Sequence, residues 1–180
     1  MLKSLTKIPR ELDNSNIDKA LTDYEVLLNQ IPCSIQSDSI LNFLTEIKRE
    51  KLNLGPYPSV TLFEAANRIM TDLIILYGVK KLLSGAIKNI KFDKYIVELG
   101  NENNNKNDIS AINGNDELIG EVFNVAKSFF QTKKSTALKK MRKGKKEKTK
   151  ILLIYNSDAV SDTYKPKSQE NEFHLKIALK

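Results

Sequence analysis

Residues 106–127 constrain the fold more than any other stretch, because two runs of alternating character flank a strong turn signal there. The turn is Asn113-Gly114-Asn115-Asp116, and Asn/Gly pairs of this kind are typical of the short connection in a β-hairpin. We therefore expect a hairpin. One of its faces is mostly apolar and should meet the core, while the other carries Asp108 and Glu121.

The register of this hairpin determines how close the two carboxylates lie. With a two-residue turn, Asn113 lies opposite Asp116, and Asp108 then lies opposite Glu121. Residues in such a pair have Cβ atoms roughly 4.5–5.5 Å apart, and a turn shifted by one residue makes the pair diagonal on the same face. Facing carboxylates repel, and a divalent cation resolves the repulsion. The alternative is a solvent-facing edge hairpin on which both carboxylates are incidental.

The elements expected around the hairpin follow a recognisable order. An apolar helix spans residues 61–83, a short strand spans 95–99, a basic amphipathic helix follows the hairpin, and an apolar strand spans 150–155. This α-β-β-β-α-β order, with one acidic residue in the second strand and one in the third, resembles the core of the PD-(D/E)XK nuclease superfamily. Many restriction endonucleases belong to that superfamily. The resemblance covers residues 61–159 and implies a restriction-endonuclease-like α/β fold, with helices flanking a mixed central sheet.

The same resemblance implies roles for individual side chains. Asp108 matches the aspartate of the motif and Glu121 the glutamate of its E-x-K element, so both would hold Mg²⁺. The sequence departs from the motif at the lysine, because Phe123 occupies that position. Lys127, at the start of the next helix, or Lys106, opposite Phe123 in the expected register, can take the place of the missing lysine.

A polar stripe interrupts the otherwise apolar helix at residues 61–83. It consists of Glu64, Asn67, Arg68 and Thr71, which share one helical face. Such a stripe should face either solvent or a site. The resemblance implies that Glu64 joins the acidic cluster as a further catalytic residue. Its other interpretation is a capping box with Thr61, and both roles are compatible.

The positive charge of the chain is concentrated in residues 127–150. This segment holds eleven Lys or Arg and a single acid, Glu147, whereas the net charge of the whole chain is +7. Dense lysines bind phosphates without reading sequence, so the segment predicts a nucleic-acid surface, although a solubilising surface is the alternative. The residues expected to bind nucleic acid are Lys133, Lys134, Lys139, Lys140, Arg142 and Lys143.

The rest of the chain indicates the domain organisation and excludes several kinds of site. Residues 1–55 are expected to form a helical lead, with helices at 17–31 and 38–51, that packs on a core at 56–180 within one domain. A lone Cys33 excludes an internal disulfide and a cysteine-based zinc site, and a lone His174 argues against His-dependent catalysis. There is no P-loop or G-x-G-x-x-G motif, so no nucleotide cofactor is expected. Without a signal-like or membrane-spanning segment, we expect a cytoplasmic protein with no membrane partner.

These observations lead to one main functional expectation. We expect a Mg²⁺-dependent endonuclease that hydrolyses phosphodiester bonds in double-stranded DNA, of the type II restriction kind, acting as a homodimer. The alternative is a non-catalytic nucleic-acid-binding module with a degenerate nuclease fold. A third hypothesis is an interaction subunit whose helical lead binds a partner protein.

Overall fold

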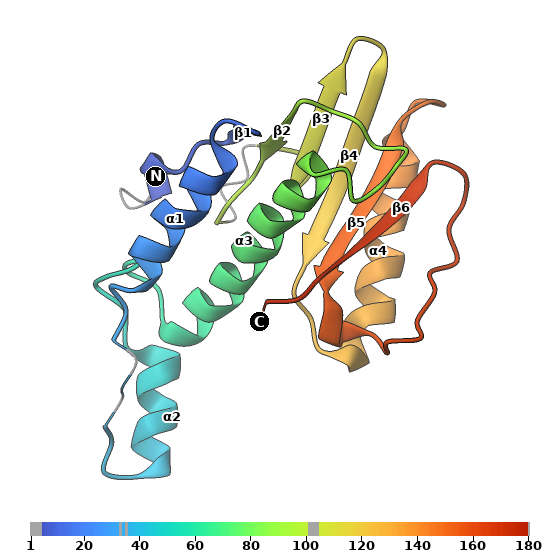
Figure 1. The fold of residues 1–180 in the computed structure, drawn as a ribbon. Helices are drawn as coiled ribbons and strands as arrows, with labels where there is room; N and C mark the ends of the chain where they lie inside the picture. Colours follow the sequence, from blue (N-terminus) through green and yellow to red (C-terminus); the bar gives the residue numbers. More distant parts are fainter. Residues whose placement is uncertain (1–4, 33, 35, 101–104, 180) are drawn as a thin grey trace.

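A six-stranded mixed sheet forms the centre of the protein (Figure 1). The structure is a computed structural model and describes residues 5–32, 34, 36–100 and 105–179. Within these ranges the strands are β1 (Glu11–Asp13), β2 (Lys94–Val97), β3 (Ile109–Asn113), β4 (Asp116–Phe123), β5 (Lys150–Asn156) and β6 (Glu172–Ile177). The four α-helices of the same ranges are α1 (Ile17–Leu28), α2 (Ile40–Arg49), α3 (Leu62–Leu83) and α4 (Phe130–Gly144). The expected mixed α/β class is confirmed.

The strands lie in the sheet in the order of the sequence, from β1 to β6. β1 to β4 pair antiparallel, while β4, β5 and β6 pair parallel. A parallel pair needs a crossover connection, and α4 supplies the one between β4 and β5. The long helix, the short strand, the hairpin, the basic helix and the apolar strand are all present in the expected order.

The hairpin has the register that the sequence predicts. Asn113 pairs with Asp116, and Ile109 pairs with Gly120. Gly114 lies in the turn with φ of +58°, a conformation that glycine adopts without steric cost. A one-residue slip would have exchanged the faces of the strand, so this register determines which side chains share the face of Glu121.

Helices cover both faces of the sheet, with α3 on one side and α4 on the other (Figure 1). The core on the α3 side includes Leu118 and Val122 of β4, together with residues of α1. The core on the α4 side includes Phe123, Phe130 and Tyr155. All of β5 after Lys150 is buried, because its side chains meet a helical layer on each face.

The N-terminal region differs in part from the expected helical lead. Residues 11–13 form the edge strand β1, which is too short to show a strand period and is specified by its pairing with β2. α1 packs in the main core as expected. α2 extends away from the body of the protein and buries none of its residues (Figure 1). Its exposed face carries Ile40, Leu41 and Leu44.

Among the described residues, no helix is both long enough and apolar enough to cross a membrane.

Candidate functional site

The two carboxylates predicted from the sequence lie on the two arms of the β3–β4 hairpin, but Asp108 is just outside the strand in which it was expected. Asp108 immediately precedes β3, and Glu121 lies in β4 one pair beyond the Ile109–Gly120 pair. The Oδ2 atom of Asp108 accepts a hydrogen bond from the backbone N–H of Val122 at 2.7 Å. This bond holds the Asp108 carboxylate against the backbone beside Glu121.

The environment of Asp108 opposes its ionised form. Burial is the main cause, and the negative charge of Glu121 adds to it, so the pKa of Asp108 rises to about 6. The Val122 N–H and the ammonium of Lys140 act in the opposite direction without cancelling the rise. A raised carboxyl pKa from burial and a like charge is common at functional sites, and any cation bound between the two acids would lower it.

Lys140 supplies a positive charge at this pair. Its Nζ lies 2.6 Å from Oε1 of Glu121, whose side chain is only 16% exposed. Lys140 projects from α4, which crosses the face of the sheet that carries Glu121. From the sequence, Lys140 is expected in the nucleic-acid surface, with no connection to the carboxylates. The signal was weak, because only the packing angle of α4 on β4 determines which of its many lysines meets Glu121.

The position of the missing motif lysine is part of the hydrophobic core. Phe123 is 6% exposed, and its ring stacks on Tyr155 with centroids 5.9 Å apart. It also contacts Phe130 of α4, at a centroid distance of 6.1 Å. An ammonium group at this depth would lose its hydration, so this position does not suit a lysine.

A pocket of about 310 Å³, here called the central pocket, opens beside the carboxylates. Asp108 and Glu121 line it from the sheet, Lys133 and Lys140 from α4, and Thr71 from α3. The remaining lining residues are Val122, Phe123, Asn124, Val125, Thr136 and Ala137. The central pocket therefore combines two carboxylates with two lysines, which suits an anionic substrate held near a cation.

A second pocket, of about 160 Å³ and here called the acidic pocket, adjoins the central pocket through Thr71 and Asp108. Three residues of the polar stripe on α3 line it, namely Asn67, Arg68 and Thr71. The stripe therefore faces a pocket in part, while Glu64 and Asn67 are exposed to solvent. The acidic pocket is completed by Asp72, Ile75, Glu98, Gly100 and Asp108.

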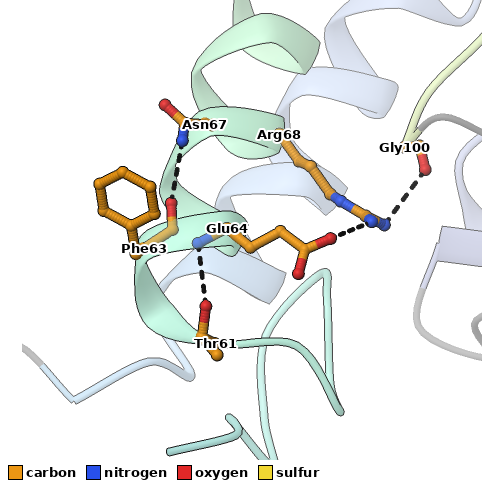
Figure 2. Close-up of polar contacts among 6 residues, drawn as sticks. All are labelled: Thr61, Phe63, Glu64, Asn67, Arg68 and Gly100. Carbon is orange, nitrogen blue, oxygen red and sulfur yellow. Dashed lines mark hydrogen bonds and ion pairs between the residues drawn. The ribbon is translucent and has the colours of Figure 1, made fainter. Parts of the chain in front are cut away.

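Glu64 lies at the start of α3 and lines neither of these pockets. Figure 2 shows its carboxylate directed at the guanidinium of Arg68, with which it forms an ion pair. Its backbone N–H donates to Oγ1 of Thr61 at 3.2 Å, so the expected helix cap is present. Arg68 also reaches the carbonyl oxygen of Gly100 at 3.5 Å, which connects α3 to the segment after β2.

The two lysines proposed as substitutes for the motif lysine are placed differently. Lys127 begins a short 3₁₀ helix, Lys127–Phe129, is exposed, and does not line the central pocket. Lys106 lines a third pocket, of about 110 Å³, together with Lys140 and Lys145. We call this the lysine pocket. It adjoins the central pocket through Lys140.

The cations of α4 are not equivalent. Arg142 forms two hydrogen bonds to the buried carboxylate of Glu172, at 2.6 and 2.8 Å, and this pairing lowers the pKa of Glu172. Lys134 donates to the hydroxyl of Tyr164 at 3.1 Å. These two cations connect α4 to the C-terminal part of the chain. Lys133, Lys139 and Lys143 are exposed and remain accessible for phosphates.

Asp72 is a buried acid next to the site that is not among the residues predicted from the sequence. Its Oδ2 accepts hydrogen bonds from the hydroxyls of Tyr24, at 2.6 Å, and Tyr57, and its Oδ1 accepts one from the backbone N–H of Gly100 at 3.1 Å. Burial raises the pKa of Asp72 to about 6 despite these donors. The signal was present in the sequence, because Asp72 continues the spacing of Glu64 and Arg68 along one face of α3.

No family model, curated protein or solved structure matched this chain. Within the described ranges, no group of three or more His, Cys, Asp or Glu side chains is placed to hold a metal ion.

Proposed function

We propose that this protein is a metal-dependent endonuclease of the restriction-endonuclease-like class, acting on double-stranded DNA, with Asp108, Glu121 and Lys140 at its centre. The observation that carries the proposal is the position of Lys140. Its Nζ lies 2.6 Å from the carboxylate of Glu121, and the two residues share the central pocket with Asp108. α4 thus offers the cation that Phe123 cannot provide.

The donor set fits Mg²⁺. Asp108 and Glu121 are neighbouring carboxylates, and burial together with their mutual repulsion raises the pKa of Asp108 to about 6. Mg²⁺ is usually bound by one or two carboxylates plus substrate phosphates, and keeps several waters. When bound, the ion would polarise the scissile phosphate and lower the pKa of a water for in-line attack.

The chain's own residues have distinct tasks in this proposal. Asp108 and Glu121 bind and orient the cation, and the Val122 N–H holds Asp108 in place for that purpose. Lys140 positions the attacking water and stabilises the charge that develops on the phosphate oxygens. Lys133, which lines the same pocket, attracts the substrate phosphates. Water adds to phosphorus as the bond to the leaving sugar oxygen breaks. The attacking water loses one proton to solvent, and the leaving oxygen takes one proton from solvent.

A type II restriction activity further calls for a homodimer, because two identical sites related by a two-fold axis can cut both strands of a palindrome. The exposed apolar face of α2, with Ile40, Leu41 and Leu44, supports such self-association. Light scattering after size exclusion checks this point, since a dimer has twice the chain mass of 20.4 kDa.

The decisive experiment compares matched variants on mixed-sequence duplex DNA with and without Mg²⁺. We expect discrete Mg²⁺-dependent fragments from the native protein and their loss in Glu121→Gln. Lys140→Met should slow cleavage by about 100-fold or more, the size of effect typical of a positioned catalytic group. Lys88→Met is the control, because Lys88 is an exposed lysine between α3 and β2, outside these pockets, and its loss removes the same charge. Cleavage that persists in both site variants would refute the assignment.

A non-catalytic nucleic-acid-binding module is the second candidate function. The observation that favours it is the aromatic Phe123 in the core, where members of the resembling superfamily carry a lysine. On this hypothesis the native protein shows salt-dependent DNA binding and no cleavage, and Glu121→Gln leaves the affinity unchanged.

A further inference from the structure

The surroundings of the central pocket are electrostatically asymmetric. On one side, Lys106, Lys140 and Lys145 line the lysine pocket against one carboxylate, Glu117. That carboxylate already accepts a hydrogen bond from the Thr149 hydroxyl at 2.8 Å. Because Lys140 is already paired with Glu121, the two lysines Lys106 and Lys145 remain against the one carboxylate of Glu117, which leaves the lysine pocket with an excess of one positive charge.

The other side of the central pocket has the opposite character. Asp72, Glu98 and Asp108 line the acidic pocket, and Arg68 is the one cation among its lining residues. The guanidinium of Arg68 is already paired with Glu64 (Figure 2). A phosphate in the acidic pocket would meet more negative than positive charge, so it would be repelled.

The spacing of the lysines suits a strand rather than a single phosphate. Lys140 lies in α4, and Lys145 follows the end of the helix five residues later. At a rise of about 1.5 Å per residue, their Cα atoms are separated by roughly 7.5 Å along the axis. Lys106 faces them from the segment before β3. Lys140 is shared by the two pockets, so a strand bound at the carboxylates can continue directly into the lysine pocket.

We propose that Lys106 and Lys145 bind the phosphate adjacent to the scissile one on the side of the lysine pocket, and that no corresponding phosphate contact forms on the side of the acidic pocket. The inference rests on the proposed function for the identity of the scissile phosphate. The binding of a phosphate by Lys106 and Lys145 is testable without any cleavage. The ligand class is the sugar-phosphate backbone of a polynucleotide.

The first test measures binding of a fluorescent 20-base-pair duplex in EDTA at several salt concentrations. The logarithm of the DNA-binding constant falls linearly with the logarithm of the salt concentration. Removing one lysine–phosphate contact makes this negative slope shallower by about 1. We expect that decrease for Lys106→Gln and for Lys145→Gln, with several-fold weaker binding at low salt. Lys88→Gln, the control, should keep the native slope. Both site lysines are at the surface, and thermal melting verifies that the variants remain folded.

The second test uses the cut site once it is located. Neutral methylphosphonates replace the phosphates on either side of the scissile bond, one at a time. Substitution of the phosphate on the side of the lysine pocket should slow cleavage by about 10-fold. This slowing should disappear in Lys145→Gln, because the variant no longer binds that phosphate. Equal effects on both sides would overturn the proposal.

The outcomes separate this inference from the proposed function. Native salt slopes in both lysine variants would overturn the phosphate site even if the protein cleaves DNA. Reduced slopes without any Mg²⁺-dependent cleavage would support the phosphate site and refute the nuclease. Reduced slopes with one-sided methylphosphonate interference would support both.

Discussion

Neutralising Asp108 should stabilise the protein, because its carboxylate is held in an unfavourable environment. The pKa of Asp108 rises from 3.8 in the unfolded chain to about 6 in the fold, through burial and the charge of Glu121. Each pKa unit corresponds to about 1.4 kcal/mol. Ionised Asp108 therefore costs the native state up to about 3 kcal/mol at pH 7. An asparagine side chain resembles the neutral acid in shape, so we expect Asp108→Asn to gain about 1–3 kcal/mol.

The stability gained by Asp108→Asn should depend on pH, and the raised pKa of Asp108 determines the direction of that dependence. A group whose pKa is raised by folding adds stability that is fully present below its unfolded pKa and is lost as pH rises through its native pKa. The advantage of Asp108→Asn should therefore be largest above about pH 6 and vanish near pH 4. Urea denaturation followed by circular dichroism, in EDTA at pH 4 to 8, measures it. At pH 7.5 the melting temperature should rise by about 3–10 °C.

Two comparisons decide whether this reasoning is right. Asp116→Asn is the matched control, because Asp116 is on the same hairpin but exposed, so it should change stability by less than about 0.5 kcal/mol. Added Mg²⁺ should raise the melting temperature of the native protein and leave that of Asp108→Asn unchanged. An Asp108→Asn variant that is less stable than the native protein at pH 7.5 would refute the argument.

Two further predictions concern the scaffold of the site. Arg142→Ala should destabilise the fold by about 2–3 kcal/mol in urea titrations, because it leaves the buried Glu172 carboxylate without its bidentate partner, whereas Lys143→Ala should have no measurable effect. An equal response of the two variants would contradict the structural role of Arg142. Gly120→Ala should cost roughly 1–3 kcal/mol, because its Cβ would lie 2.5 Å from Cγ2 of Ile109 and 3.0 Å from the carbonyl oxygen of Leu152. An unchanged urea midpoint would contradict this prediction, because it would show that β3 and β5 move apart around the added methyl group without a loss of stability.

The local pattern of the sequence was sufficient to predict the hairpin and its two faces. The alternation around the Asn-Gly-Asn-Asp turn specifies which residues share a face, since a slip of one residue would expose the apolar face. It therefore predicted that Asp108 and Glu121 lie on one face, but it left open whether they are directly opposite or diagonal, and the turn that pairs Asn113 with Asp116 decided this. The long helix α3 and the strand β5 were also predictable from local sequence. Apolar residues cover most of the circumference of α3, and β5 is an almost continuous apolar run, so both had to be buried.

Other features depend on how distant elements pack. Neither the edge strand β1 nor the bond from Arg142 to Glu172 has a local signal, since each exists through a partner far away in the sequence. The same holds for Lys140. Its neighbours in α4 are chemically equivalent lysines, and only the packing of α4 on β4 brings one of them to Glu121. The sequence by itself determined that two carboxylates and a dense run of lysines would be present, because local periodicity encodes strands and helices. Tertiary structure alone decided which lysine meets the carboxylates, because that depends on the orientation of one helix on the sheet.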